Sequence, residues 1–173
     1  MNKIKNKKGK WIKLICGASN EDIVAIEDLC AIYTAAGVDY IDVAAEESIV
    51  NAAKKGIEWA QKICNNSPGL MISISDGNDI HFRKAKFDPL RCPSNCSRPC
   101  EKVCPTFAID ISGIKESKCY GCGRCINSCP LNLISEYEYN LSKYDLATTL
   151  QKTKPNAVAV SYTHLTLPTI SSV

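Results

Sequence analysis

The sequence lacks the features that mark membrane proteins, nucleic-acid-binding proteins and nucleotide-dependent enzymes. Its 173 residues contain no apolar run long enough to span a bilayer and no segment like the apolar part of a signal peptide. The net charge of +3 is too small to indicate a nucleic-acid partner. Most of the excess lies in the first 13 residues, so residues 1–10 are predicted to form a basic flexible tail. Neither a Gly-x-Gly-x-x-Gly nor a Walker string occurs, and the Cys-x3-Cys-x2-Cys triplet of radical enzymes is absent.

Histidine is scarce, with 2 residues, whereas cysteine is abundant, with 11. Eight of these cysteines fall between positions 92 and 129, and the remaining Cys16, Cys30 and Cys64 lie singly in apolar segments. An odd count with isolated members argues against a disulfide scaffold. The clustered cysteines are therefore the candidate functional residues.

The clustered cysteines form two runs with related spacing. The second run, Cys119 to Pro130, has three cysteines two residues apart, a fourth three residues further on, and then proline, which is the spacing of bacterial ferredoxins. The first run, Cys92 to Pro105, has its first two gaps one residue longer. A shift of 25 positions places Cys100 on Cys125, Cys104 on Cys129, Pro105 on Pro130 and Ile109 on Ile134. We interpret the two runs as half-motifs of one duplicated fold.

The ferredoxin spacing implies two [4Fe–4S] clusters with interleaved ligands. In two-cluster ferredoxins the cysteine before proline ligates the other cluster, because a tight loop presents three thiolates to one cluster but does not reach the fourth corner. Carried over to this sequence, the first cluster takes Cys92, Cys96, Cys100 and Cys129. The second takes Cys119, Cys122, Cys125 and Cys104.

Two other readings of these cysteines stay open at this point. Zinc sites use pairs of Cys-x-x-Cys in a closed tetrahedron, whereas here a triplet with a remote fourth cysteine occurs twice. The stretched first run also allows Cys92 to swing out, which would leave a three-cysteine site with a labile fourth iron. We expect iron–sulfur clusters, with the apolar pairs Ala108–Ile109 and Leu133–Ile134 enclosing them.

The flanking sequence has the pattern of an α/β fold. Strands are predicted over 11–16, 38–44 and 70–75, because each is a short apolar run bounded by turn residues. A helix is predicted after a capping box made by Ser19 and Asp22, and it ends at Gly37. A second helix begins at Glu46 and Glu47 and ends before residue 65. Alternating strands and helices with short links predict a parallel sheet, here part of a (β/α) barrel-like fold.

The predicted domain boundaries follow from these patterns. Residues 11–86 form partial β/α barrel-like units, 87–140 an inserted two-[4Fe–4S] ferredoxin-like domain, and 141–159 a helix and the start of the next strand. Residues Val160–Thr169 match, over ten consecutive codons, the in-frame translation of a transposon-type sequencing adapter. We therefore expect residues 160–173 to be a non-native tail and the chain to be the front half of a longer protein. The truncated sheet would then expose an apolar edge.

Four strings make a more specific resemblance visible. Residues 11–20, 36–45, 81–89 and 119–125 resemble the light-dependent period proteins, the iron–sulfur input components of the cyanobacterial circadian clock. The resemblance covers about residues 10–159, and the stretched first cysteine run is part of it. It implies a redox-sensitive two-cluster protein associated with clock and histidine-kinase components. It also implies that Cys92 is a ligand.

Three functions are weighed from the sequence. The first is a redox sensor or electron carrier, in which reduction of a cluster is felt by the basic residues Arg98, Lys102, Lys118 and Arg124. The second is the electron-transfer domain of a barrel-type oxidoreductase, with candidate residues at the strand ends: Ser19, Asn20, Asp42, Glu46, Asp76, Asn78 and His81. The third is a purely structural iron–sulfur domain. We favour the sensor over an enzyme. Its expected partners are proteins, either clock or histidine-kinase components or an electron donor. We expect a cytoplasmic location, because exposed cluster thiolates need a reducing compartment.

Overall fold

The computed structural model describes residues 11–16, 22–75, 83–139 and 143–161. At its centre is a four-stranded parallel sheet in the order β1-β2-β3-β8. The strands are β1 (Lys13–Ile15), β2 (Tyr40–Ala44), β3 (Gly69–Ser75) and β8 (Ala157–Ser161). This order follows the chain once the segment between β3 and β8 is set aside, so the predicted parallel sheet is confirmed.

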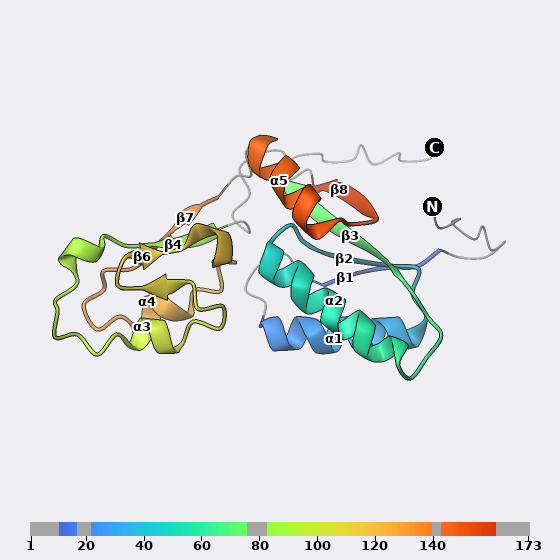
Figure 1. Ribbon diagram of the computed structural model, residues 1–173, viewed down its shortest axis with the longest axis horizontal. Helices are drawn as coiled ribbons and strands as arrows, with labels where there is room; N and C mark the ends of the chain where they lie inside the picture. The colour runs from blue at the N-terminus through green and yellow to red at the C-terminus, as the bar shows by residue number, and fades with distance from the viewer. Residues whose placement is uncertain (1–10, 17–21, 76–82, 140–142, 162–173) are drawn as a thin grey trace, which may run out of the picture.

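Three helices complete the sheet unit, namely α1 (Ile23–Ala36), α2 (Glu47–Gln61) and α5 (Lys143–Thr153). Figure 1 shows α1 and α2 side by side along the sheet. They approach closely because Gly56 has no side chain; a Cβ there would lie 2.0 Å from the carbonyl oxygen of Glu27. Helix α5 is tied to α2 by the Lys54 ammonium, which donates to the carbonyl oxygen of Thr153 at 2.6 Å.

The core of this unit is formed by apolar side chains of β2 and β3 packed against α1 and α2. Ile26, Ile41, Val50 and Ile72 are fully buried there. In β2, Ile41 and Val43 point to the same face because side chains alternate along a strand. The paired residues Leu70 and Ile72 of β3 continue that face, and the helices cover it.

The start of α1 differs from the sequence prediction. The N-cap is Asp22, whose side chain accepts a hydrogen bond from the Val24 amide at 3.0 Å. The capping box with Ser19 as its first residue is therefore wrong, because the helix starts at Ile23; Ser19 itself lies outside the described residues. The predicted end is confirmed, since Gly37 adopts the left-handed conformation with φ 82°.

The cysteine-rich insert runs from β4 (Arg83–Lys86) to β7 (Ser135–Glu138) and separates β3 from β8 in the chain. Its remaining elements are η1 (Pro89–Arg91), α3 (Pro99–Lys102), β5 (Ile109–Asp110), β6 (Gly113–Ile114), η2 (Glu116–Lys118) and α4 (Arg124–Ser128). The outer strands β4 and β7 pair antiparallel, and so do the inner strands β5 and β6. In Figure 1 the insert lies at the left, beside the sheet unit.

The two outer strands of the four-stranded sheet carry exposed apolar residues, as predicted. Ile15 of β1 and Val158 and Val160 of β8 are among the exposed large hydrophobic side chains. Strand β8 extends to Ser161, two residues beyond the predicted boundary, and residues 162–173 lie outside the described part, so the non-native tail stays a prediction. Among the described helices, none combines the length and apolarity needed to cross a membrane.

Candidate metal centre

The two halves of the insert have the same order of elements. Each half consists of a strand, a 3-10 turn, a cysteine loop, a short helix and a second strand. Left-handed residues recur with a spacing of 25: Arg98 and Gly123 precede the short helices, and Phe107 and Asn132 follow the last cysteine of each run. The internal repeat read from the cysteine spacing is therefore present in the fold.

The hydrogen bonds to the last cysteine of each run also repeat. The Ala108 amide donates to the sulfur of Cys104 at 3.2 Å, and the Leu133 amide donates to the sulfur of Cys129 at 3.4 Å. In the first loop, the Arg98 amide donates to the sulfur of Cys96 at 3.4 Å. Backbone amides aimed at cysteine sulfurs stabilise the thiolate form, which is the form that ligates metal.

Most of the eight cysteines share one apolar interior. Cys100 and Cys125, which occupy equivalent positions in α3 and α4, are buried, and the other six are partly buried. Five of the eight lie in one hydrophobic cluster with Ala85, Ile109 and Ile134: Cys100, Cys104, Cys119, Cys125 and Cys129. Ile109 and Ile134 thus pack with these cysteines, and the enclosure of clusters by the two apolar pairs stays a prediction.

The thiols that perturb one another separate into two groups. Burial, and then the nearby thiolates of Cys119, Cys122 and Cys104, raise the pKa of Cys125 to about 12. Burial and the thiolate of Cys96 raise the pKa of Cys92, and Cys129 adds to this effect. Cys129 also raises the pKa of Cys100, after burial.

The last cysteine of each run acts on thiols of the other run, because Cys129 affects Cys92 and Cys100 and Cys104 affects Cys125. For Cys129, burial alone would raise the thiol pKa, but the amides of Leu133, Leu131, Ile134 and Asn132 outweigh it and lower the pKa. The two full ligand sets stay a prediction.

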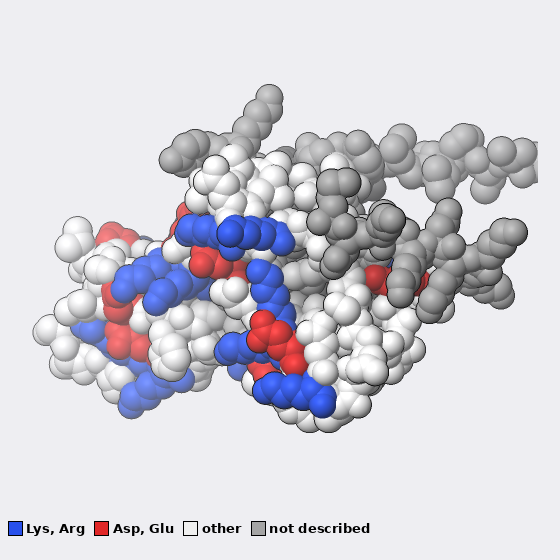
Figure 2. Space-filling view, turned by 45° about the vertical axis from the view of Figure 1, so that its right-hand side comes forward, with Lys and Arg blue, Asp and Glu red and all other residues white. Residues whose placement is uncertain are grey.

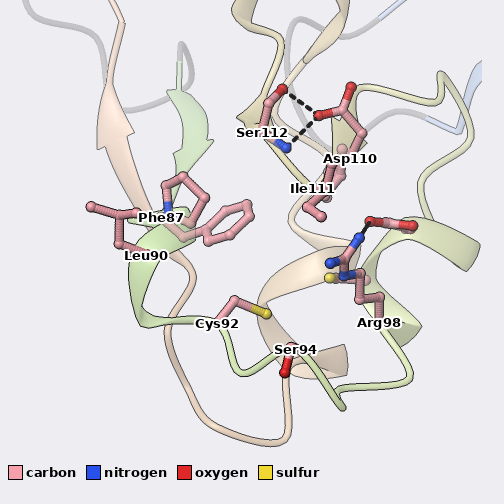
Figure 3. A pocket seen from close by; sticks show the side chains of 12 residues that line it. Phe87, Leu90, Cys92, Ser94, Arg98, Asp110, Ile111 and Ser112 are labelled. Carbon is pink, nitrogen blue, oxygen red and sulfur yellow. Dashed lines mark hydrogen bonds and ion pairs between the residues drawn. The ribbon is translucent and has the colours of Figure 1, made fainter.

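Two cavities adjoin the cysteine loops. The larger, about 570 Å³, is lined by Cys92 and Cys100 together with Arg98, Leu90 and Ile111. In Figure 3 the sulfur of Cys92 points into this cavity. The smaller cavity is lined by all four cysteines of the second set, namely Cys104, Cys119, Cys122 and Cys125. It has about 20 Å³ of free space, so a cluster would enter it only with an outward shift of the cysteine loop.

The chemistry of this donor set fits an iron–sulfur cluster. Cysteine thiolates are the ligands that hold such clusters, and both runs supply them. Among the described residues the buried Tyr120 hydroxyl has no hydrogen-bond partner. The side chain lies between two predicted ligands along the chain and beside the Cys122 thiol. A thiolate at Cys122 accepts hydrogen bonds more strongly than a thiol does, so ligation would supply the hydroxyl with a partner.

The second cysteine loop is wedged against the sheet unit. Tyr120 belongs to the hydrophobic core formed by α1, α2 and the sheet, and Cys122 packs against that core. Arg124 forms an ion pair with Asp22, the N-cap of α1, at 2.6 Å. Gly121 is required here, because φ is +83° and a Cβ would lie 2.0 Å from the Arg83 carbonyl oxygen.

A buried charged pair joins the insert to the sheet unit on its other side. The ammonium of Lys84, in β4, lies 3.3 Å from the carboxylate of Glu46 and donates to the Glu116 carbonyl oxygen at 2.9 Å. It also lies 3.8 Å from the ring centroid of Tyr139. Burial raises the pKa of Glu46 to about 7, although Lys84 opposes this shift.

Sequence reasoning missed Lys84 and Tyr120 as site residues. Lys84 stands between Arg83 and Ala85 in a strand with other lysines, and no pattern distinguishes the buried lysine from the exposed Lys86. Tyr120 could have been found from its place between Cys119 and Cys122, since a large side chain inside a tight ligand loop must pack somewhere.

The other sequence candidates have ordinary structural surroundings or lie outside the described residues. Asp42 is buried, pairs with Lys13 at 2.8 Å and accepts from the Ser73 hydroxyl at 2.6 Å. Cys16 and Cys30 are buried with their sulfurs 3.8 Å apart, far from the insert in sequence. Ser19, Asn20, Asp76, Asn78 and His81 lie outside the described residues. On the face shown in Figure 2, Lys and Arg side chains lie beside Asp and Glu side chains, in keeping with the low net charge.

Comparison with known proteins identifies the insert. Residues 92–140 match the LdpA Fe-S cluster-binding domain. The chain is 44% identical over 153 residues to "Light dependent period A" of Synechococcus elongatus, covering 88% of this chain and 44% of that protein. It therefore spans less than half the length of this relative. No solved structure matches.

More distant similarity extends to two redox proteins. The "Arsenate respiratory reductase iron-sulfur subunit ArrB" of Shewanella sp. ANA-3 is 31% identical over 49% of this chain and 34% of its own length. The "Putative oxidoreductase UacF" of Escherichia coli is 33% identical over 51% of this chain and 15% of its own length. The duplicated cysteine loops, the domain match and the long alignment agree, and the chain is a homologue of Light dependent period A with an iron–sulfur cluster-binding domain inserted in an α/β fold.

Proposed function

We propose that the insert holds two [4Fe–4S] clusters with interleaved ligands. The first would be bound by Cys92, Cys96, Cys100 and Cys129, and the second by Cys119, Cys122, Cys125 and Cys104. The observation that carries this proposal is the duplicated backbone, in which the last cysteine of each run receives the same amide hydrogen bond and faces the triplet of the other run.

Each cluster, when bound, supplies a one-electron redox couple. The residues of the chain shield it, donate hydrogen bonds to its thiolates and respond to its charge. A unit charge added about 5 Å from a neighbouring charge changes its energy by about 3 kcal/mol at an effective dielectric constant of 20. A change of this size is enough to bias an interface between two arrangements.

The proposed biological role is a redox sensor that passes the redox state of the cell to a circadian clock. Support comes from the name of the relative, Light dependent period A, and from the wedged position of the second loop, where Tyr120 and Arg124 contact the sheet unit. The partner in this role would be a protein, either a clock or histidine-kinase component or an electron donor, in the cytoplasm. We further propose that the sheet is part of a (β/α) barrel and that the insert has the two-cluster ferredoxin fold, since outer and inner strands pair as two antiparallel ribbons.

The alternative function is electron transfer within a barrel-type oxidoreductase. The two more distant relatives favour it, because one is named as an iron–sulfur subunit of a reductase and the other as a putative oxidoreductase. The carboxyl end of β2, where Glu46 meets Lys84 of the insert, lies where barrel enzymes place their active sites. A reduction potential within the cellular range without substrate turnover favours the sensor, and turnover of a substrate favours the enzyme.

Paired cysteine variants test the interleaved ligand sets. The chain is reconstituted anaerobically with iron and sulfide, and iron per chain is measured. The variant Cys92→Ala/Cys129→Ala removes two ligands of one proposed set and should keep one cluster. The variant Cys119→Ala/Cys129→Ala removes one ligand from each set and should keep none. Cys64→Ala, outside the insert, serves as the control and should keep both clusters.

Reversal of this result would overturn the proposed ligation. If each run bound its own cluster, Cys119→Ala/Cys129→Ala would keep one cluster and Cys92→Ala/Cys129→Ala would keep none. Absence of acid-labile sulfide from the unaltered protein would overturn the proposal altogether.

A further inference from the structure

Equivalent positions before the two short helices carry different residues, an arginine in the first half and a glycine in the second. The residue before the short helix is left-handed in both halves, with φ 49° at Arg98 and φ 72° at Gly123. Glycine adopts this conformation without steric cost, whereas a residue with a side chain is strained there by about 1 kcal/mol or more. An arginine kept in a strained position at a ligand loop indicates a function for its side chain.

The guanidinium of Arg98 faces the predicted site of the first cluster. It lines the cavity of about 570 Å³ together with Cys92 and Cys100, and the Arg98 amide donates to the sulfur of Cys96 at 3.4 Å. Figure 3 shows the Arg98 side chain at the edge of this cavity. A cation in this place stabilises added negative charge at the site.

The charge of Arg98 is partly offset within the same helix. The guanidinium lies 3.2 Å from the carboxylate of Glu101, and both side chains are about one-quarter to one-third exposed. Glu101 lines the same cavity as Arg98. The first site therefore has a cation and an anion side by side in its lining.

The second half has no counterpart of this arrangement. Gly123 has no side chain, and Ile126 stands where the first half has Glu101. The neighbouring Arg124 is turned to Asp22 at the start of α1. Any effect of the Arg98–Glu101 pair is therefore confined to the first site.

Resting on the two-cluster function proposed above, we propose that Arg98 tunes the first cluster, raising its reduction potential, and that Glu101 limits the increase. Reduction adds one electron and one negative charge to the cluster, and the positive charge of Arg98 favours the reduced form. The two clusters are thereby made unequal by a difference in sequence at one loop position.

Redox titration of the anaerobically reconstituted protein tests this inference. Arg98→Gly places in the first loop the residue that the second loop already has. It should lower one of the two midpoint potentials, changing the reduced-to-oxidised ratio of that cluster on the order of tenfold, and leave the other midpoint unchanged. Glu101→Gln should raise the same midpoint. Lys62→Gln, which removes an exposed cation outside the insert, is the control and should move neither.

Thermal unfolding distinguishes the proposed role of Arg98 from a structural one. Because glycine relieves the left-handed strain, the proposal expects Arg98→Gly to keep the thermal unfolding midpoint of the unaltered protein or to raise it. A structural role would lower that midpoint. The inference is overturned if both midpoints are unchanged in a fully loaded Arg98→Gly protein, or if Glu101→Gln moves the midpoint in the same direction. Iron content separates the two proposals. If neither the unaltered protein nor any variant binds iron, the two-cluster function is contradicted. If the unaltered protein and Arg98→Gly both bind iron and have the same midpoint potentials, only the role of Arg98 is contradicted.

Discussion

The buried pair of Glu46 and Lys84 makes stability depend on pH in an unusual direction. Most carboxylates stabilise a fold in their ionised form, but burial raises the pKa of Glu46 from 4.5 to about 7. A carboxyl whose pKa is higher in the folded than in the unfolded chain stabilises the fold when it is protonated. This contribution is fully present below pH 4.5 and is lost as the pH rises through 7.

The size of the effect follows from the shift. The interval between 4.5 and 7 corresponds to about 3 kcal/mol, at about 1.4 kcal/mol for each tenfold change in proton affinity. The Glu46 side chain is 15% exposed, so solvent screening reduces this only in part. For a chain of this size, 3 kcal/mol corresponds to roughly 6–12 °C in the unfolding midpoint.

The test compares Glu46→Gln with the unaltered protein in anaerobic thermal unfolding between pH 4.5 and 8.5. Effects of the clusters and of other groups are common to both proteins, so the difference between the two curves isolates Glu46. We expect the unaltered protein to lose several degrees relative to Glu46→Gln as the pH rises.

Two results would refute this reasoning. Parallel curves would mean that Glu46 titrates alike in the folded and unfolded chain. A gain in stability of the unaltered protein over Glu46→Gln between pH 5 and 8 would mean that Glu46 is ionised and that its pair with Lys84 outweighs burial.

Three further predictions concern single residues at the contacts of the insert and the sheet. Tyr120→Phe removes a buried hydroxyl that has no hydrogen-bond partner among the described residues, so it should stabilise the cluster-free protein by about 1 kcal/mol in denaturant unfolding. In the loaded protein it should lower one midpoint potential, and the opposite signs would show that the hydroxyl does not serve the cluster. Gly121→Ala should lower the free energy of unfolding by more than about 2 kcal/mol, because its Cβ would meet the Arg83 carbonyl. Gly123→Ala, where the Cβ would lie in open space, should lower it by about 1 kcal/mol. Equal losses would contradict the close approach at Gly121. Gly56→Ala should separate α1 from α2 and lower the unfolding midpoint by several degrees, and an unchanged midpoint would contradict their packing.

Much of the fold could be predicted from the sequence because its patterns are local. The apolar runs that became β1, β2, β3 and β8, with short links between strands and helices, determine a parallel sheet. Gly37 marks the helix end because only a left-handed residue fits there. The helix start was misjudged because Ser19 and Asp22 are both good N-cap residues, and only the folded chain shows that Asp22 caps the helix.

The site could be predicted only as far as its cysteines. Their spacing indicates the duplicated loops, and the fold brings the two sets together. What surrounds them could not be predicted, since the burial of Lys84 and the contact of Tyr120 with the core depend on how the insert meets the sheet unit. The strain at Arg98 is likewise visible only in the backbone angles, although the comparison with Gly123 was available from the repeat.

The central claim is that the insert holds two cubane clusters. Its most direct test is the iron and acid-labile sulfide content of the anaerobically reconstituted chain, with the electron paramagnetic resonance spectrum after reduction. We predict about eight irons and eight sulfides per chain and signals from two interacting one-electron centres. About four irons and four sulfides, with a single isolated signal, would contradict the account.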